Sequence, residues 1–203
     1  MKIEEQIKET NRKFFDFWAV TYDWSILKPW LYSLQKKAVS SIKLKNNLHI
    51  LDLGCGTGDS LLLLYHLNKN LNLYGLDISE KMLKRANKKL KEKAILRQGE
   101  AGKIPFRDNL FDYVITTEAF HHFPNPNLAL KEIFRILKKG GKLILTDITF
   151  KSSIIKSLFK FLEPGHVKIY TKEEFKDLFA KNKFKVIKQE KIGLFVILNM
   201  VKK

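Results

Sequence analysis

The stretch Ile-Leu-Asp-Leu-Gly-Cys-Gly-Thr-Gly, residues 50–58, decides how this chain folds. The apolar run 48–53 predicts a buried strand, and three alternate glycines predict a tight turn. The apolar run 61–67 predicts a helix that Asp59 caps. Glycine adopts backbone angles that other residues avoid and lets a ligand approach the main chain. The pattern is typical of a nucleotide-type site on a Rossmann-like sheet, with helix N–H groups that favour a polar ligand group.

The spacing of the glycines separates this turn from two related motifs. Gly54, Gly56 and Gly58 form G-x-G-x-G, whereas dinucleotide sites carry G-x-G-x-x-G and phosphate-binding loops end in Gly-Lys-Ser/Thr. A second apolar run, 71–76, ends at Asp77, about 20 residues further on, where a carboxylate is placed to accept hydrogen bonds from a ribose diol. Together these features indicate an adenosine ligand without a pyrophosphate.

Further motifs follow in order along the chain. They are Gly-Leu-Asp-Ile-Ser (75–79), Gln-Gly-Glu-Ala (98–101), Ile-Pro-Phe (104–106), Phe-Asp-Tyr-Val (111–114), His-His-Phe (121–123) and Ile-Leu-Lys-Lys-Gly-Gly (136–141). With these motifs the chain resembles the class I S-adenosylmethionine-dependent methyltransferases, most closely the ubiquinone/menaquinone-type small-molecule branch (methyltransferase type 11). The resemblance implies an α/β fold: a Rossmann-like seven-stranded sheet, mostly parallel with an antiparallel C-terminal strand, helices on both faces and an N-terminal helical lid.

The resemblance also implies the cofactor, S-adenosyl-L-methionine, with S-adenosyl-L-homocysteine as the product. The residues that it assigns to cofactor binding are Asp52, Gly54, Cys55, Gly56, Gly58, Asp77, Ile78, Glu100, Ala101 and Thr117. Asp52 and the glycine turn are expected at the methionyl end and Asp77 at the ribose. Glu100, where the family typically has Asp, is expected to accept the hydrogen bond of the adenine amino group. Ile78 and Ala101 would line the base pocket, and Thr117 would lie near the methyl donor.

The catalytic role is open among three candidates. His121 and His122 follow a strand expected over 111–117, in a loop that faces the reaction in open α/β sheets, and a histidine can serve as a base near neutral pH. Adjacent side chains point differently, so at most one is expected to face the substrate, and a structural role stays open for both. Tyr22 is expected to contact cofactor or substrate, or to pack. No metal is expected, because the histidines lack further ligands at suitable spacing.

The chain is expected to form a single domain, 1–203. It divides into an N-terminal helical cap (1–46), a cofactor-binding core (47–150) and C-terminal helices with a strand hairpin (151–203). The expected helices are 3–18, 29–44, 59–67, 79–91, 127–137, 152–162 and 171–182, and the expected strands are 48–53, 71–76, 94–98, 111–117, 142–150, 184–190 and 194–201. Ser79 is expected to cap one helix, Thr171 with Glu174 another, and Gly140-Gly141 to close the helix that ends at 137.

Composition limits the alternatives. The 38 Lys and Arg against 21 Asp and Glu give a net charge of +17, which admits nucleic acid or an anionic membrane surface. However, the lysines are scattered through helices without the arginine and aromatic residues of a typical RNA patch, so solvated surfaces are favoured. One cysteine excludes an internal disulfide and, with no signal-peptide pattern or membrane-spanning run, predicts a cytoplasmic protein. Peripheral membrane contact through 152–162 stays open, as do a monomer and a homodimer.

The leading hypothesis is methyl transfer to a small-molecule O, N or C nucleophile. The alternatives are a tRNA or other RNA methyltransferase and a catalytically inactive, methyltransferase-like binding subunit; a dehydrogenase ranks below them. The tetrapeptide 116–119 lacks the Asn/Asp-Pro-Pro-Tyr/Phe motif of enzymes that methylate base amino groups, which argues against that reaction on DNA or RNA. The absence of a Gly-Phe-Arg signature argues against a quinone ring, and a single cysteine argues against arsenite.

Overall fold

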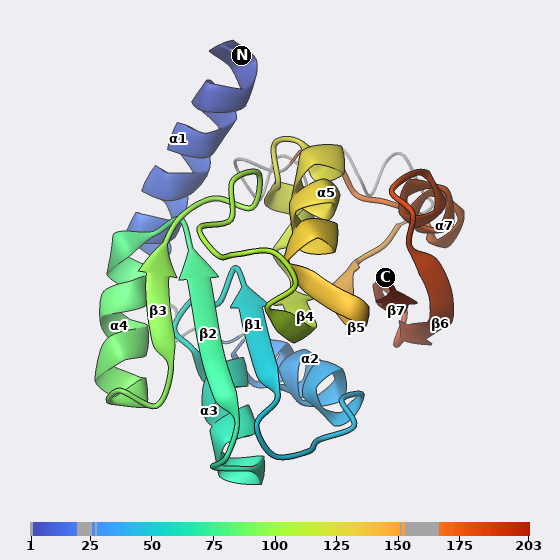
Figure 1. The fold of residues 1–203 in the computed structure, drawn as a ribbon. Helices are drawn as coiled ribbons and strands as arrows, with labels where there is room; N and C mark the ends of the chain where they lie inside the picture. Colours follow the sequence, from blue (N-terminus) through green and yellow to red (C-terminus); the bar gives the residue numbers. More distant parts are fainter. Residues whose placement is uncertain (1, 20–25, 27, 151, 153–166) are drawn as a thin grey trace.

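A seven-stranded sheet forms the centre of the computed structural model, which describes residues 2–19, 26, 28–150, 152 and 167–203. The strands are β1 (His49–Leu53), β2 (Asn72–Asp77), β3 (Ile95–Gln98), β4 (Phe111–Thr117), β5 (Leu137–Ile148), β6 (Lys185–Ile192) and β7 (Val196–Lys202). Their order is β3-β2-β1-β4-β5-β7-β6 (Figure 1). β1 to β5 pair in parallel, and β7 lies antiparallel between β5 and β6. This arrangement confirms the predicted fold class.

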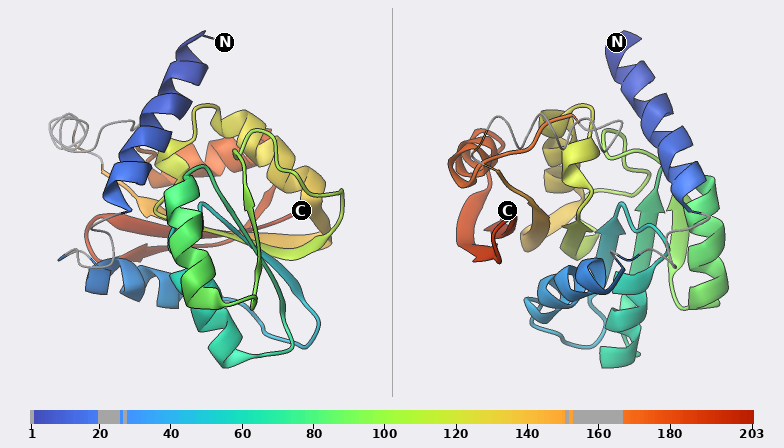
Figure 2. Two further views of the ribbon diagram at one scale, coloured as in Figure 1. Left: turned by 90° about the vertical axis from the view of Figure 1, so that its left-hand side faces the viewer. Right: turned by 180° about the vertical axis from the view of Figure 1, so that it is seen from behind.

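Helices cover both faces of the sheet, as the two further views show (Figure 2). They are α1 (Lys2–Trp18), α2 (Lys28–Ser40), α3 (Asp59–Leu67), α4 (Glu80–Leu90), α5 (Pro126–Ile136) and α7 (Lys172–Lys181), with a short 3₁₀ helix, η2 (Phe120–His122). α2, α3 and α4 pack on one face, and α5 and α7 on the other. α1 instead lies at the carboxyl edge of the parallel strands and extends beyond it (Figure 1).

The alternation of side chains along each strand divides the core into two layers. Ile50 of β1 packs with Leu61 of α3, whereas its neighbour Leu51 packs on the other face with Ile133 of α5, and all four side chains are fully buried. Because helices cover both faces of the sheet, the side chains of a central strand are buried on either face. Apolar and polar residues therefore do not alternate along such a strand. This explains why the central strand β4 reads as an almost unbroken apolar run in the sequence.

Two local expectations were wrong. The helix expected over 127–137 spans Pro126–Ile136, but Gly140-Gly141 do not close it: β5 begins at Leu137, so both glycines lie in the strand, where Gly140 takes a φ of +80°. Asp59 does not cap α3. The cap residue is Gly58, at a φ of +83° and without a side-chain cap bond, and the Asp59 carboxylate forms ion pairs with Lys28 and with Lys89 at 2.5 Å. Two lysine charges hold this carboxylate away from the helix N–H groups.

Other local expectations are confirmed. The Ser79 hydroxyl accepts the Met82 N–H at 3.1 Å at the start of α4, and Thr171 and Glu174 form the expected capping box of α7. β6 and β7 form the C-terminal hairpin. Tyr22 and, apart from Ser152, the helix expected over 152–162 lie outside the described residues. No helix in the described part of the chain has the length and apolar character needed to cross a membrane.

The glycine turn yields a test of the fold. Gly54 and Gly193 both have positive φ, +77° and +60°, but a Cβ on Gly54 would lie 2.7 Å from Ala119 Cβ, whereas one on Gly193 would meet nothing within 4 Å. Each Gly→Ala variant should lose roughly 1–2 kcal/mol of unfolding free energy to backbone strain. Gly54→Ala should lose about 1–3 kcal/mol more through overpacking. Urea unfolding checks this, and equal losses for the two variants would contradict it.

Candidate active site

A cavity of about 870 Å³ opens at the carboxyl edge of the sheet. The turns after β1, β2, β3 and β4 border it on one side, and residues of α1 and the first turns of α2 border it on the other. Predicted cofactor residues on its wall are Gly54, Gly56, Asp77, Ile78, Glu100, Ala101 and Thr117. Asp52, Cys55 and Gly58 lie behind this wall. The structure therefore brings together residues from four separate turns of the chain.

Main-chain hydrogen bonds fix the glycine turn to the end of β2. The N–H groups of Gly54 and Cys55 donate to the Leu76 carbonyl oxygen at 2.8 and 3.1 Å. The Gly56 N–H donates to Asp77 Oδ2 at 2.8 Å, and the Ser79 N–H donates to Asp77 Oδ1 at 2.9 Å. One carboxylate thus connects the glycine turn with the start of α4.

The three glycines meet different constraints. Gly56 combines a φ of +50° with open space, since a Cβ there would meet nothing within 4 Å, and its main chain is exposed to the cavity. At Gly58 a Cβ would approach Leu90 Cδ1 to 2.9 Å, so this glycine allows α3 and α4 to pack closely. The Cys55 side chain belongs to the core, and burial raises the pKa of its thiol well above the ordinary value, which is unsuited to a nucleophile.

Carboxylates gather at the cavity although the protein is strongly basic. Asp77, Glu100 and Glu118 line it, and Asp52 lies behind the turn with 2% of its surface exposed. Burial, reinforced by the negative charges of Asp77 and Asp59, raises the pKa of Asp52 to about 8. Burial also raises the pKa of Asp77. A positively charged ligand group would relieve this repulsion.

Four polar contacts hold α1 across the cavity. Lys8 forms an ion pair with Glu100 at 2.5 Å, which raises the pKa of Lys8 chiefly through the hydrogen bond. The Asn11 amide donates to the His122 carbonyl oxygen at 2.8 Å. Asp16 accepts the Ser79 hydroxyl at 2.6 Å, and Glu4 accepts the amide of Asn125 at 3.0 Å. One helix therefore contacts the turns that follow β2, β3 and β4.

The two histidines lie side by side on the cavity wall. Their ring centroids are 4.1 Å apart, and both side chains are buried. His121 Nδ1 lies 2.5 Å from Asp147 Oδ1, whereas the His122 ring packs edge-on against Phe15 with a centroid distance of 4.9 Å. Both side chains border the cavity. The expectation that at most one of them faces the substrate stays a prediction.

Several residues at the site were not found from the sequence. Glu118 borders the cavity with a φ of +53°, a strained value for a residue other than glycine, and Asn11 and Gln35 reach it from α1 and α2. Asp147 holds His121 from the end of β5. Glu118 and Asp147, like Asp77, are acidic residues at the carboxyl ends of strands, and that position was a usable signal. Nothing local in the sequence indicates Asn11 or Gln35.

Three buried polar atoms on the cavity wall have no hydrogen-bond partner among the described residues. They are Asn11 Oδ1, Gln35 Oε1 and Thr117 Oγ1. A buried polar atom without a partner costs about 1–3 kcal/mol. These atoms and the acidic groups match a ligand that carries N–H donors, hydroxyls and positive charge.

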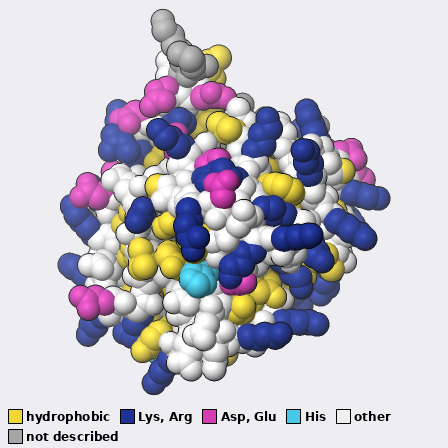
Figure 3. All heavy atoms as spheres, viewed as in Figure 1, with side chains coloured by type: hydrophobic (Ala, Val, Ile, Leu, Met, Phe, Trp, Pro, Cys, Tyr) yellow, Lys and Arg dark blue, Asp and Glu magenta, His cyan; other side chains and the backbone are white. Residues whose placement is uncertain are grey.

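The structure gives less support to a metal site or to a nucleic-acid interface. No group of three or more His, Cys, Asp or Glu side chains in the described part of the chain is arranged to hold a metal ion. Lysine and arginine side chains are spread over the face shown in Figure 3, with apolar and neutral surface between them. That view shows no single basic stripe of the kind that tracks a nucleic-acid backbone.

Comparison with known proteins identifies the family. The family model for a methyltransferase domain matches residues 44–192, and the chain belongs to that family. This confirms the resemblance that the sequence motifs gave. The demethylmenaquinone methyltransferase of Lactiplantibacillus plantarum is 39% identical over 116 residues, covering 54% of this chain and 49% of that protein. That of Thermotoga maritima is 36% identical over 114 residues, covering 56% and 49%. The chain spans about half the length of the curated relatives that it matches.

Solved structures agree on the fold. A chain of the complex between the Haloferax volcanii Trm112 methyltransferase activator and its partner superposes with a TM-score of 0.84 at 20% identity, covering 93% of this chain and 96% of that one. A SAM-dependent methyltransferase from Aquifex aeolicus gives a TM-score of 0.69 at 21% identity, covering 83% and 88%. At these identities the likeness concerns the fold alone.

The raised pKa of Asp52 predicts a pH dependence of stability. Between its ordinary pKa of 3.8 and about 8, Asp52 is protonated in the folded protein and ionised in the unfolded chain. The stabilisation is complete below pH 3.8 and is lost as the pH rises to about 8. The unfolding free energy of the wild type, relative to Asp52→Asn, should therefore fall from pH 5 to pH 8 by up to about 1.4 kcal/mol per pH unit.

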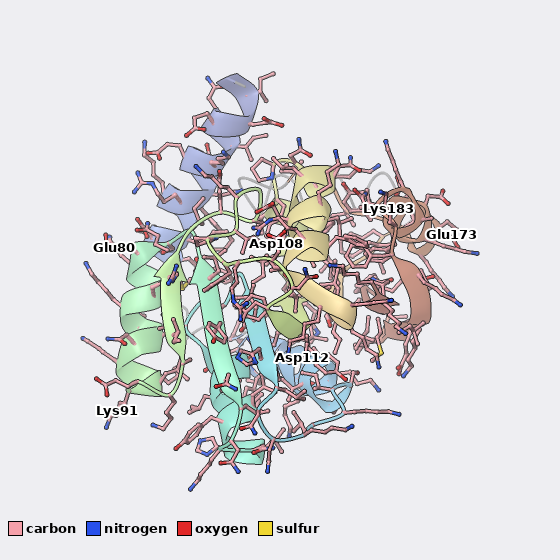
Figure 4. All side chains as sticks on the ribbon, viewed as in Figure 1. Glu80, Lys91, Asp108, Asp112, Glu173 and Lys183 are labelled. Carbon is pink, nitrogen blue, oxygen red and sulfur yellow. The ribbon has the colours of Figure 1, made fainter. Side chains whose placement is uncertain are left out.

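Urea unfolding at four pH values measures this slope. Asp112→Asn serves as the control, since it removes a carboxylate near the start of β4 (Figure 4) that does not line the cavity. A difference between the wild type and Asp52→Asn that stays constant from pH 5 to pH 8 would show that Asp52 is ionised in the folded protein, contrary to this interpretation.

Proposed function

We propose that this protein is an S-adenosylmethionine-dependent methyltransferase that methylates a small apolar molecule. The observation that carries the proposal is the cavity at the carboxyl edge of the sheet, in which the glycine turn, acidic side chains and buried polar atoms meet aromatic residues of α1 and α2. Its volume of about 870 Å³ lies in the upper part of the range for ligand pockets, about 300–1,000 Å³, which favours a cofactor together with an acceptor.

The cofactor fits the residues that are present. Asp77 would hold the ribose hydroxyls, and Glu100 would accept the adenine amino group, with Ile78 and Ala101 beside the base. The main chain at Gly54 and Gly56 would face the methionyl end. Glu118 would offset the positive charges of the ammonium and sulfonium groups, and Asp52 would do so once it loses its proton as the ligand binds. The polar atoms of Asn11, Gln35 and Thr117 that find no described partner would gain one.

The bound cofactor supplies an activated methyl group on its sulfonium. The chain's contribution is to align the acceptor with that group and to exclude water. α1 supports both tasks, because its contacts with the turns after β2, β3 and β4 close one side of the cavity. Aromatic side chains of α1 and α2 make this side apolar; they are Phe14, Phe15, Trp18 and Trp30. They favour a flat, apolar acceptor.

The relatives support the same substrate class. The two named above are demethylmenaquinone methyltransferases, which by their name act on a small molecule. We do not extend that substrate to this chain, which lacks the Gly-Phe-Arg signature that we expect in quinone methylators. The lysine and arginine side chains scattered over the face in Figure 3 give RNA methylation no comparable support. Seven of the ten residues predicted to bind the cofactor line the cavity, which favours an active enzyme over an inactive binding subunit. Cytoplasmic location and a monomeric or homodimeric state stay predictions.

A thermal-shift titration with S-adenosylmethionine, S-adenosylhomocysteine and NAD tests the proposal. A ligand at 100 times its Kd should stabilise the protein by about 2.7 kcal/mol, or roughly 5–10 °C in Tm. Both adenosyl ligands should give this shift, and NAD should not. A folded protein that responds to neither adenosyl ligand would refute the proposal.

Two variants locate the binding site. Asp77→Asn and Glu100→Gln should each weaken S-adenosylhomocysteine binding about 10- to 100-fold, because each removes a hydrogen bond to a charged group, worth roughly 1.5–3 kcal/mol. Glu80→Gln is the control, since it removes a negative charge from the first turn of α4 outside the cavity wall. Isothermal titration calorimetry gives the Kd values, and equal affinities for all three variants would contradict the assignment.

A further inference from the structure

We propose that His121 is the general base of the methyl transfer, that Asp147 is its positioning residue, and that the acceptor is an aromatic hydroxyl compound. This inference rests on the proposed function and adds the proton chemistry and the acceptor class. It starts from a buried contact between the turn after β4 and the end of β5, in which His121 is 3% exposed and Asp147 1% exposed.

The hydrogen bonds of Asp147 determine which ring nitrogen of His121 carries the proton. Asp147 Oδ2 accepts the His121 N–H at 2.9 Å, and Oδ1 accepts the Ile148 N–H at 2.8 Å. These two main-chain donors fix the carboxylate, and Oδ1 then lies 2.5 Å from His121 Nδ1. Because a carboxylate only accepts hydrogen bonds, Nδ1 must donate. In the neutral ring the basic lone pair is therefore on Nε2.

The main chain holds the ring in place on both sides. The N–H of His121 is bound to Asp147, and its carbonyl oxygen accepts the Val167 N–H at 2.9 Å. The side chain borders the cavity, whereas Asp147 lies behind it. This division between a base at the reacting group and a buried acid that orients it is the arrangement general-base catalysis requires.

The surroundings of the base select the acceptor. Phe15, Phe123 and Pro124 lie on the cavity wall with His121, and the His122 ring packs against Phe15. Such a wall favours a flat apolar ring over a charged acceptor. A neutral imidazole is matched to a weakly acidic hydroxyl group, which becomes a strong nucleophile on losing its proton. An aromatic hydroxyl compound meets both conditions.

The step balances without a further reactant. His121 Nε2 takes the hydroxyl proton, and the oxygen electron pair forms a bond to the methyl carbon. The carbon–sulfur bond of S-adenosylmethionine breaks, and its electron pair stays on sulfur, which becomes the neutral thioether of S-adenosylhomocysteine. Asp147 keeps its negative charge beside the imidazolium that forms. The proton leaves His121 for water after product release.

Nitrogen NMR of protein with ¹⁵N-labelled histidine tests the inference without a known acceptor. With S-adenosylhomocysteine bound, the wild type should show His121 as a single tautomer with the proton on Nδ1. Adding 2-naphthol should shift the His121 Nε2 resonance through a hydrogen bond. The matched probe 2-methoxynaphthalene, which has the same rings and no hydroxyl proton, should leave that resonance in place.

The variant Asp147→Asn should lose the single tautomer and show averaged nitrogen shifts. Asp112→Asn is the control: it changes a carboxylate 3.9 Å from a different histidine, His49, away from the cavity, and should leave His121 unchanged. A proton on Nε2 in the wild type, or a 2-naphthol response absent or equal to that of the methyl ether, would overturn the inference. The same samples separate the two proposals, since a failure to bind S-adenosylhomocysteine would refute the proposed function itself.

Discussion

The carboxylate of Asp77 is the constraint on which the rest of the site depends. A buried charge is costly unless it is hydrogen-bonded, and here the N–H groups of Gly56 and Ser79 bind its two oxygens. These bonds join the end of β2 to the glycine turn and to the first turn of α4. Because Ser79 also binds Asp16, the same connection continues into α1. Asp77 therefore holds together the glycine turn, the turn after β2 and, through Ser79, α1.

The charges at the cavity are opposite in sign to the net charge of the protein. The chain carries +17 overall, yet the groups at the cavity are mostly acidic, and burial keeps the pKa of Asp52 near 8. Grouping buried acids raises the free energy of the empty site. A ligand with two positive groups recovers that free energy on binding, whereas an anionic ligand would add to the repulsion. We therefore expect the cavity to bind a phosphate-rich cofactor less well than a positively charged one.

The sequence predicted features that depend on neighbouring residues. Strand periodicity, the glycine spacing, the Ser79 cap and the Thr171–Glu174 capping box are all local, and the structure contains them. Asp59 failed as a cap because Lys28, 31 residues away, and Lys89, 30 residues away, bind its carboxylate. Gly140 failed as a helix end because pairing with β4 extends β5 back to the end of α5. The pattern of neighbouring residues does not reveal such contacts between distant parts of the chain.

At the candidate site, too, local features were predictable from the sequence and contacts between distant residues were not. Asp77 and Glu100 were found because motif and strand end coincide, and the histidines because they follow β4. The contacts that organise them join distant residues: Asn11 lies 111 residues from His122, and His121 lies 26 from Asp147. Only the folded sheet brings these pairs together. His121 was a candidate from the sequence, but nothing near it in the chain indicates that Asp147 is its partner.

A crystal structure with S-adenosylhomocysteine bound would show directly which residues hold the cofactor. We predict density for the ligand in the cavity, with the ribose hydroxyls on Asp77, the adenine amino group on Glu100 and the amino-acid end beside Gly54 and Gly56. Density at another edge of the sheet, or an adenosyl group that contacts neither carboxylate, would contradict the account.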